Sequence, residues 1–253
     1  MSPNAQRADL ACGYVLHQRP YRDTSLIVEI YTRDHGRFHA FARAARGPRT
    51  RFLGLQPFRP LLMSWSGRGE APTLTAAEAD GPPPPPLAAD RLLSAFYLNE
   101  LLIKLTVAHD PHAELFAHYA STIERLRSGQ PLDLVLRQFE KRLLDLLGYG
   151  TDLSYDTSGS AVITDAYYHF RAGEGVWRAE AGVRDQGVRD QGILVTGRVL
   201  LAMANDEPLT DLEGQRQMKT LLRAALDHCL DGRELNVRKV ARAVARIGQS
   251  SGG

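Results

Sequence analysis

The sequence predicts an α+β protein in which a small five-stranded β-barrel precedes a mainly helical domain. Three observations predict it: alternating apolar residues in the first 80 positions, a run of five prolines, and helical periodicity after that run. The prolines, residues 82–86, remove amide donors and fix φ, so they fit an extended linker and neither a helix nor a central strand. We therefore expect domains at residues 1–81 and 88–253, joined by a linker at 82–87.

The barrel is predicted from short segments with strand periodicity. Leu26, Val28 and Ile30 would share one face of a strand, because successive side chains point to opposite faces. Turn signals divide residues 8–80 into about five strands. They are Arg19-Pro20, His35-Gly36, Gly47-Pro48 and Gly67-Arg68-Gly69. Five strands in this length are typical of the closed barrels that bind oligonucleotides, the OB-folds.

Helical periodicity begins after the prolines. Residues 88–107 place leucines and a phenylalanine along one broad stripe, which predicts the first helix. Asp110 followed by Pro111 predicts the N-cap and first position of a second helix that ends near Leu126. Gly148 predicts a left-handed end to a third helix. This third helix is predicted at residues 132–147, and further helices are predicted at 197–205, 210–230 and 236–247.

An irregular, β-containing insert is expected at residues 150–195. Glycine and aspartate are scattered there among strand-like pieces at 161–170 and 176–179. A five-residue sequence at 183–187 is repeated at 188–192. Such a duplication would put the faces of a helix or strand out of phase, so we expect an exposed loop there.

The overall composition indicates a globular protein with a buried core. Hydrophobic residues make up 43% of the 253 residues. Cys12 and Cys229 are too few for a disulfide framework or a zinc cage. No run approaches the roughly 20 apolar residues of a membrane span, and the N-terminus lacks the apolar stretch of a secretory signal. We expect a cytoplasmic protein.

The positive charge is concentrated near the N-terminus. Residues 33–68 contain eight arginines and one acid, Asp34, although the whole chain has a net charge of only +2. Residues 81–232, by contrast, hold 15 basic and 21 acidic residues. An asymmetry of this kind favours a surface for polyanions on the N-terminal domain.

A strand at 37–43 would carry part of that surface. Alternation would direct Arg37, His39, Phe41 and Arg43 to one face and Phe38, Ala40 and Ala42 to the other. Guanidinium groups pair with phosphates, and unstacked bases pack on aromatic rings, so the first set fits single-stranded nucleic acid. Arg46, Arg49 and Arg51 extend the charge into the next loop. In the alternative, Phe41 packs beneath that loop and the arginines only solvate it.

Known catalytic motifs are missing from the sequence. It contains no phosphate-binding loop before Lys-Ser or Lys-Thr, no Gly-x-Ser-x-Gly, and no Gly-x-Gly-x-x-Gly. The nearest metal-like cluster is His109, Asp110, His112, Glu114 and His118. Its spacing matches no standard ligand set, and a capped, hydrated helix terminus explains it better. We predict no catalytic residue, metal or cofactor, with a metal-dependent nuclease or phosphoesterase and an RNA-binding barrel as alternatives.

Several stretches resemble a known family over nearly the whole chain. They include Val15-Leu-His-Gln-Arg-Pro-Tyr, Thr32-Arg-Asp-His-Gly-Arg37, Ala42-Arg-Ala-Ala-Arg46, Tyr97-Leu-Asn-Glu-Leu-Leu102 and Leu146-Leu-Gly-Tyr-Gly150. In order and spacing the chain is similar to RecO, the bacterial recombinational repair mediators. The resemblance implies an OB-fold barrel followed by a helical domain, without enzymatic activity.

The resemblance also implies partners. Members of this family, in the RecF pathway, bind single- and double-stranded DNA, anneal complementary strands, associate with RecR and help load RecA onto DNA coated with single-strand-binding protein. The family's basic residues after the third strand fall on Arg43 and Arg46. An apolar pocket holds the C-terminal tail of single-strand-binding protein, and the family arginine there corresponds to Arg137. An ion pair with Glu140 or Asp133 is the alternative role for Arg137.

Three departures from the family pattern change the expectations. Many members carry a four-cysteine zinc cluster after the third helix, whereas residues 150–195 contain no cysteine, so we expect no zinc there. The family's Lys-Gly-Ala-Arg becomes Arg43-Ala44-Ala45-Arg46, so we expect a reshaped turn. The usual Lys-Ser-Arg-Glu near the C-terminus becomes Asn236-Val-Arg-Lys239. Arg238, Lys239 and Arg242 could still form a second DNA contact.

Overall fold

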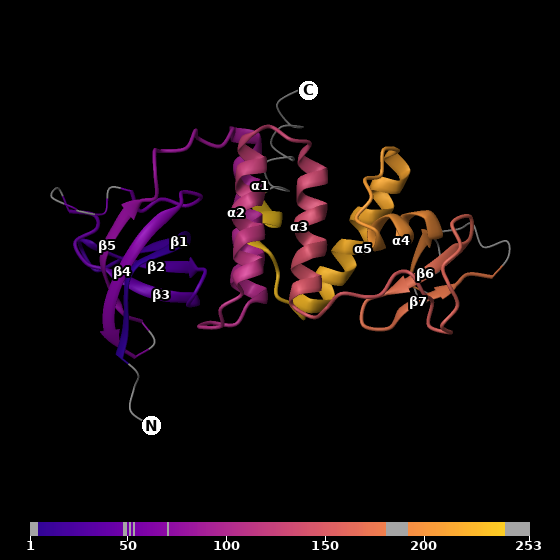
Figure 1. Ribbon diagram of the computed structural model, residues 1–253, viewed down its shortest axis with the longest axis horizontal. Coiled ribbons are helices and arrows are strands. Elements are labelled where there is room, and N and C mark those ends of the chain that lie inside the picture. Colours follow the sequence, from indigo (N-terminus) through magenta and orange to yellow (C-terminus); the bar gives the residue numbers. More distant parts are fainter. Residues whose placement is uncertain are drawn as a thin grey trace. The chain divides into compact units, whose positions relative to one another are not determined.

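The computed structural model describes residues 5–47, 50, 52, 54–69, 71–180 and 192–240. The chain forms two compact units, one of Met1–Gln130 with Leu235–Gly253 and one of Pro131–Glu234. In the described residues, the first contains a β-barrel, two long helices and a helical segment at 236–240, and the second contains three helices and a small sheet (Figure 1). Among the helices of the described ranges, none combines the length and apolar character needed to cross a membrane.

The N-terminal sheet closes into the five-stranded barrel that the sequence predicted. Its strands are β1 (Ala5–Tyr21), β2 (Ser25–Thr32), β3 (Gly36–Ala42), β4 (Leu61–Arg68) and β5 (Thr73–Ala79). They pair in the order β1-β2-β3-β5-β4, and the long strand β1 pairs with both β2 and β4. Closure removes the free sheet edges that a small open sheet would leave.

The barrel core follows the predicted alternation. On β3, Phe38, Ala40 and Ala42 are buried, whereas Arg37, His39 and Phe41 are not, as expected for one face toward the core. Val28 and Ile30 of β2 are also fully buried. The prediction that β3 has one buried face and one outward face is therefore confirmed.

One predicted turn is wrong. Arg19-Pro20 lies within β1, which continues to Tyr21, and the chain reverses only at residues 22–24. Pro20 is tolerated there because β1 pairs with β4 only as far as Gly13, so beyond that point one side of the strand needs no amide donor.

Two helices pack on the barrel within the first unit. They are α1 (Ala89–Leu105) and α2 (Ala113–Arg127). Tyr14 and Tyr31 of the barrel pack against Phe116 and Tyr119 of α2, with ring centroids 5.2–6.1 Å apart. This buried aromatic cluster joins the barrel to α2.

The predicted cap of α2 is also wrong. The helix begins at Ala113, and the Asp110 carboxylate instead binds Nε2 of His112 at 3.1 Å. The preceding segment pairs with the barrel, because the His109 amide donates to the carbonyl of Arg37 at 2.8 Å. Gly36, at φ +66°, permits this approach, since a Cβ there would lie 2.4 Å from the Asp110 carbonyl oxygen. The connection follows the barrel before the helix starts.

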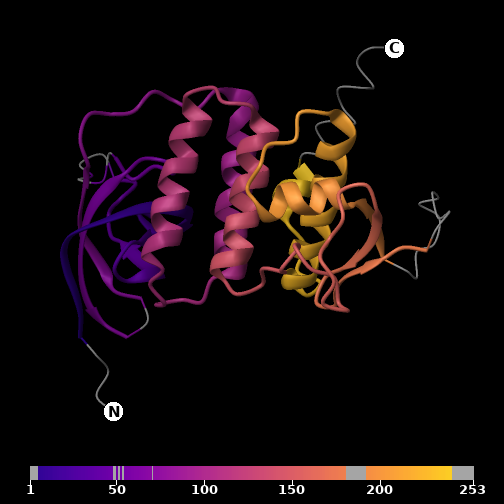
Figure 2. The ribbon, with the colours of Figure 1, turned by 45° about the vertical axis from the view of Figure 1, so that its right-hand side comes forward.

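The second unit combines the remaining helices with a three-stranded antiparallel sheet. Its elements are α3 (Leu132–Leu146), β6 (Tyr167–Arg171), β7 (Gly175–Arg178), β8 (Ile193–Thr196), α4 (Gly197–Ala204) and α5 (Leu212–Leu230). The sheet order is β7-β6-β8, and Figure 2 shows the sheet beside α4 and α5. Gly148 follows α3 at φ +79°, the left-handed conformation predicted for it. The 183–192 repeat lies outside the described residues except for Gly192.

Candidate nucleic-acid interface

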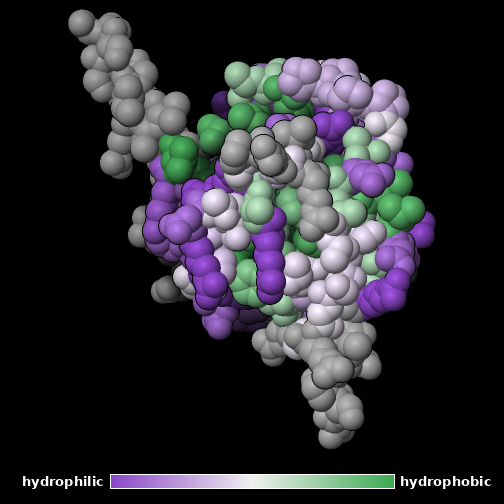
Figure 3. Space-filling model, turned by 90° about the vertical axis from the view of Figure 1, so that its left-hand side faces the viewer, coloured by the Kyte–Doolittle hydropathy of each residue, from purple (hydrophilic) through white to green (hydrophobic). Residues whose placement is uncertain are grey.

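Basic and aromatic side chains meet on the outer surface of β1, β2 and β3. Arg19 and Phe41 are both in register with Ile27 of β2, so the three residues form one row across the strands. The turn between β1 and β2 and the turn after β3 lie at the same end of the barrel. We call this surface the basic face, which comprises Arg19, Tyr21, Arg22, His39, Phe41, Arg43 and Arg46. Figure 3 shows the barrel side of the molecule, where hydrophilic side chains gather in separate clusters.

A cluster of one guanidinium group and two aromatic rings lies at the end of the basic face. The Arg22 guanidinium carbon is 5.3 Å from the centroid of the Tyr21 ring. The Tyr21 ring in turn packs on Phe41, with centroids 5.2 Å apart and planes inclined by 51°. Both rings are only half buried. A cation beside partly exposed aromatic rings is the arrangement that accepts a phosphate and a neighbouring base.

Two arginines lie in the turn after β3. Arg46 is exposed, and its guanidinium donates to the carbonyls of Arg22 and Asp23, so it joins this turn to the β1–β2 turn. Arg43 is exposed and has no ion-pair partner among the described residues. Ala44 has φ +55°, so the turn uses the left-handed conformation even though alanine occupies it.

Arg37 is largely covered by neighbouring groups of the first unit. Its side chain is 12% exposed and forms an ion pair with Glu29, which also binds Nε2 of His39. The Arg37 guanidinium also donates to Oγ1 and the carbonyl oxygen of Thr106, at 3.1 and 2.8 Å. The end of α1 thus covers this part of β3, which differs from the exposed position expected for Arg37. His39 stays 54% exposed. Arg49 and Arg51 lie outside the described residues.

The predicted second contact is described only in part. Residues 236–240 are helical, and the amides of Asn236 and Val237 donate to the Glu100 carboxylate at 2.7 and 2.9 Å. Arg238 is half buried, with its guanidinium 5.8 Å from the Tyr97 ring centroid, and Lys239 is exposed. Arg242 and the rest of the predicted helix lie outside the described residues.

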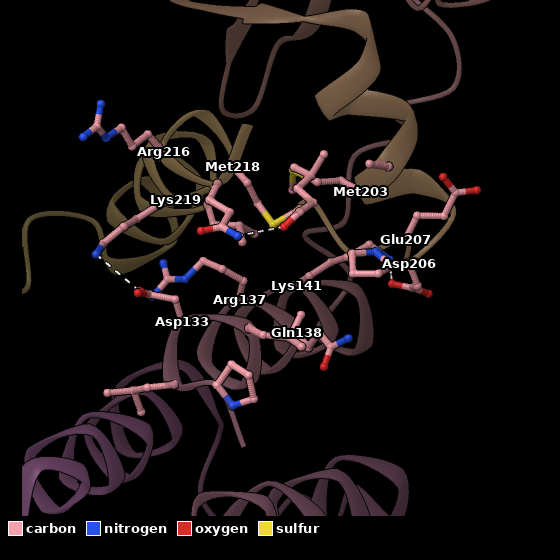
Figure 4. Close-up of a pocket in the computed structure, with 18 of the residues that line it drawn as sticks. Asp133, Arg137, Gln138, Lys141, Met203, Asp206, Glu207, Arg216, Met218 and Lys219 are labelled. Atoms are coloured by element: carbon pink, nitrogen blue, oxygen red, sulfur yellow. Dashed lines mark hydrogen bonds and ion pairs between the residues drawn. The ribbon is translucent and has the colours of Figure 1, made fainter. Parts of the chain in front are cut away.

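Arg137 lies in a pocket of about 440 Å³ in the second unit. Figure 4 shows Arg137 and Lys141 on α3 facing Met218 and Lys219 on α5. Leu132, Leu134, Leu209, Leu212 and Leu222 add to its apolar lining. A pocket that combines leucine and methionine with several cations suits an apolar group carrying negative charge.

The cations of this pocket have acidic neighbours. Arg137 forms an ion pair with the fully buried Glu140, so the alternative expected for this arginine is present, while Asp133 pairs with Lys219 at 3.5 Å. Nε of Arg137 is buried without a hydrogen-bond partner among the described atoms. Burial alone would lower the pKa of Lys141, but its bonds to Asp206 and Asp145 outweigh burial and raise it. Lys141 therefore remains a cation of this pocket at neutral pH.

Comparisons with known proteins agree with this architecture. Residues 10–82 match the family model "Recombination protein O N terminal", and residues 87–239 match "Recombination protein O C terminal". The chain belongs to the RecO family of DNA repair proteins. It is 43% identical over 244 residues to DNA repair protein RecO of Azoarcus sp. (strain BH72), covering 96% of this chain and 98% of that protein. The RecO protein of Alkalilimnicola ehrlichii is 45% identical over 92% of this chain and 91% of its own length.

Possible metal ligands of this RecO-family chain are scattered. Within the described ranges, no three His, Cys, Asp or Glu side chains are grouped so that they could hold a metal ion. In the 109–118 segment, His109 stacks on Phe38 with planes inclined by 17°, and His112 binds Asp110. His109 therefore serves packing, and His112 makes a local hydrogen bond.

Sequence reasoning missed Arg19, Tyr21 and Arg22 as members of the basic face. The predicted turn at Arg19-Pro20 placed them in a loop, whereas β1 continues and brings Arg19 into register with β2. The signal that could have found them is the pairing of β1 with β2. A hairpin that turns at residues 22–24 places Tyr21 at the end of the barrel where β3 ends, with β2 between the two strands.

Proposed function

We propose that this RecO-family protein binds single- and double-stranded DNA through the basic face without cleaving it. In this proposal it anneals complementary strands in the cytoplasm, at the nucleoid, associates with RecR, and helps load RecA onto DNA coated by single-strand-binding protein. The observation that carries the proposal is the cluster of Arg22, Tyr21 and Phe41, beside exposed Arg43, on an OB-fold barrel of a DNA repair family.

The chemistry of the basic face supports contacts with the DNA backbone. Guanidinium groups of Arg19, Arg22 and Arg43 can pair with phosphates, and this contribution is independent of sequence. The aromatic rings add stacking of unpaired bases, which is tolerant of base identity. A protein that anneals strands needs this combination, because it must hold any sequence and leave the pairing edges of the bases accessible.

The experiment is a DNA-binding titration with the double variant Arg22→Ala/Arg43→Ala. Both side chains are exposed, so their loss should leave the fold intact. We expect affinity for single and double strands to fall roughly tenfold, alike for all sequences. Arg33→Ala is the matched control, because Arg33 is 57% exposed, pairs with Asp34 and lies in the β2–β3 turn. Unchanged DNA affinity of the double variant contradicts the proposed interface.

We further propose that the Arg137 pocket binds the C-terminal tail of single-strand-binding protein. A chain terminus that ends in an apolar residue would place its side chain against the leucine and methionine lining and its carboxylate near Arg137. Arg137→Ala should impair binding of such a peptide and leave binding of bare DNA unchanged. Arg223→Ala is the control, since Arg223 lies on α5, pairs with Asp227 and is outside the pocket. Equal peptide binding by Arg137→Ala and the unmodified protein would exclude this role.

A further inference from the structure

A groove of about 680 Å³ adjoins the basic face within the first unit. One wall is the outer surface of β1–β3, the second is α1, and the third is the helical segment at residues 236–240. His17, Arg19 and His39 belong to the strand wall. Arg19 and His39 are also members of the basic face, so the two surfaces are continuous.

The α1 wall of the groove is apolar and accessible. Leu93 and Phe96 are 36% and 37% exposed, and Val240 on the third wall is 48% exposed. Phe96 is held by an edge-to-face contact with Phe58 at a centroid distance of 4.9 Å. Apolar side chains fixed in position and open to solvent provide a surface on which a flat aromatic ligand can pack.

The carboxylates that line the groove are neutralised by partners on the protein. Glu29 is 4% exposed and binds both Arg37 and His39. Glu100 accepts the amides of Asn236 and Val237 and lies 3.6 Å from Lys104. Arg19, by contrast, has no ion-pair partner within the described part of the chain. The groove therefore presents positive charge beside an apolar wall, without a competing free acid.

We propose that this groove takes unpaired bases of the DNA strand held on the basic face, so that it selects single-stranded over duplex DNA. The inference rests on the proposed function, because the strand must first be bound by the neighbouring arginines. Unstacked bases could pack on Leu93 and Phe96 while Arg19 binds the adjoining phosphate. Bases of a duplex are paired and stacked, so they cannot enter without melting. Continuity with the Tyr21–Phe41 ring pair favours nucleic acid over an acidic peptide as the occupant.

Two neighbouring leucines on α1 allow a matched test. Leu93→Glu would put a carboxylate into the groove, while Leu92→Glu makes the same change at a residue that is 40% exposed and does not line it. Binding is measured by fluorescence anisotropy with a single strand of about 16 nucleotides and with the same sequence as a duplex. We expect Leu93→Glu to weaken single-strand binding about tenfold and to leave duplex binding unchanged. Leu92→Glu should behave like the unmodified protein.

The same titrations separate failure of this inference from failure of the proposed function. If Leu93→Glu binds single strands normally while Arg22→Ala/Arg43→Ala loses affinity for both DNA forms, the groove is not a base site and the basic face stands. If Arg22→Ala/Arg43→Ala keeps its affinity for both DNA forms, the proposed function itself is contradicted, whatever Leu93→Glu does. Leu93→Gln, which adds no charge, should reduce single-strand affinity less than Leu93→Glu. If Leu93→Glu binds DNA normally and loses binding only to an acidic peptide, the groove is not a site for bases.

Discussion

The side-chain amide of Asn99 joins α1 to the barrel by donating a 2.7 Å hydrogen bond to the carbonyl oxygen of Leu16 in β1. The Asn99 oxygen accepts a second bond, also of 2.7 Å, from the Tyr119 hydroxyl on α2. Asn99 is 2% exposed and Tyr119 is fully buried. One side chain on α1 thus satisfies buried polar groups on two other elements, β1 and α2.

Replacing Asn99 by alanine should therefore destabilise the first unit. The change leaves the Leu16 carbonyl and the Tyr119 hydroxyl buried and unpaired, and we expect a loss of about 2–4 kcal/mol in the free energy of unfolding. Tyr119→Phe, which removes one bond and keeps the ring, should cost about 1–2 kcal/mol. Urea denaturation measures both. If Asn99→Ala were as stable as the unmodified protein, the amide would not join these elements energetically.

The left-handed conformation of Ala44 offers a stabilising substitution. A residue with a Cβ pays about 1–2 kcal/mol at positive φ, and Ala44 has φ +55°. Ala44→Gly should relieve most of this cost, offset in part by the greater freedom of glycine in the unfolded chain, for a net gain of about 0.5–1 kcal/mol. Thermal unfolding measures the gain. Ala45→Gly, in the same turn, is the control and should lower stability; equal effects at both positions would refute the explanation.

The sequence predicted those features of the barrel that depend on local periodicity. The buried set of β3, Phe38, Ala40 and Ala42, followed from alternation alone, because the period of a strand is independent of its neighbours. Burial of Arg37 could not be predicted in this way. It depends on Thr106, which is 69 positions away and binds the guanidinium only because α1 ends over β3.

The candidate site shows the same division between local and distant determinants. Arg43 was expected to be exposed after β3, and it is, because a charged residue in a turn has no element to cover it. The position of Arg22 could not be predicted, because it depends on the pairing of β1 with β2. The pocket around Arg137 could not be predicted either, because it depends on α5, which begins 75 positions later at Leu212. Residues that lie together here are brought together by topology, which a single sequence leaves open.

Asp211, the N-cap residue of α5, should make the protein less stable as the pH falls into the acid range. The Arg198 guanidinium and then the Gly214 amide hold the pKa of Asp211 at about 2, below its usual 3.8. The pKa of Asp211 is lower in the folded state than in the unfolded state. Its contribution to the stability of the fold is therefore complete above about pH 3.8 and is lost as the pH falls toward 2. Asp211→Ala should lower the Tm at neutral pH, and the difference should disappear near pH 2. Asp227→Ala is the control, and a pH-independent difference for Asp211→Ala would contradict the linkage.

Salt dependence should report how many phosphates the basic face neutralises. Its four arginines, Arg19, Arg22, Arg43 and Arg46, could each replace one condensed counterion on a single strand. The logarithm of the association constant should then fall with the logarithm of salt concentration at a slope of about −3. Arg22→Ala/Arg43→Ala should make that slope shallower by about 1.4, whereas Arg33→Ala should leave it unchanged. A slope near zero would mean that guanidinium–phosphate pairs contribute little, and the basic face would then not be the binding surface.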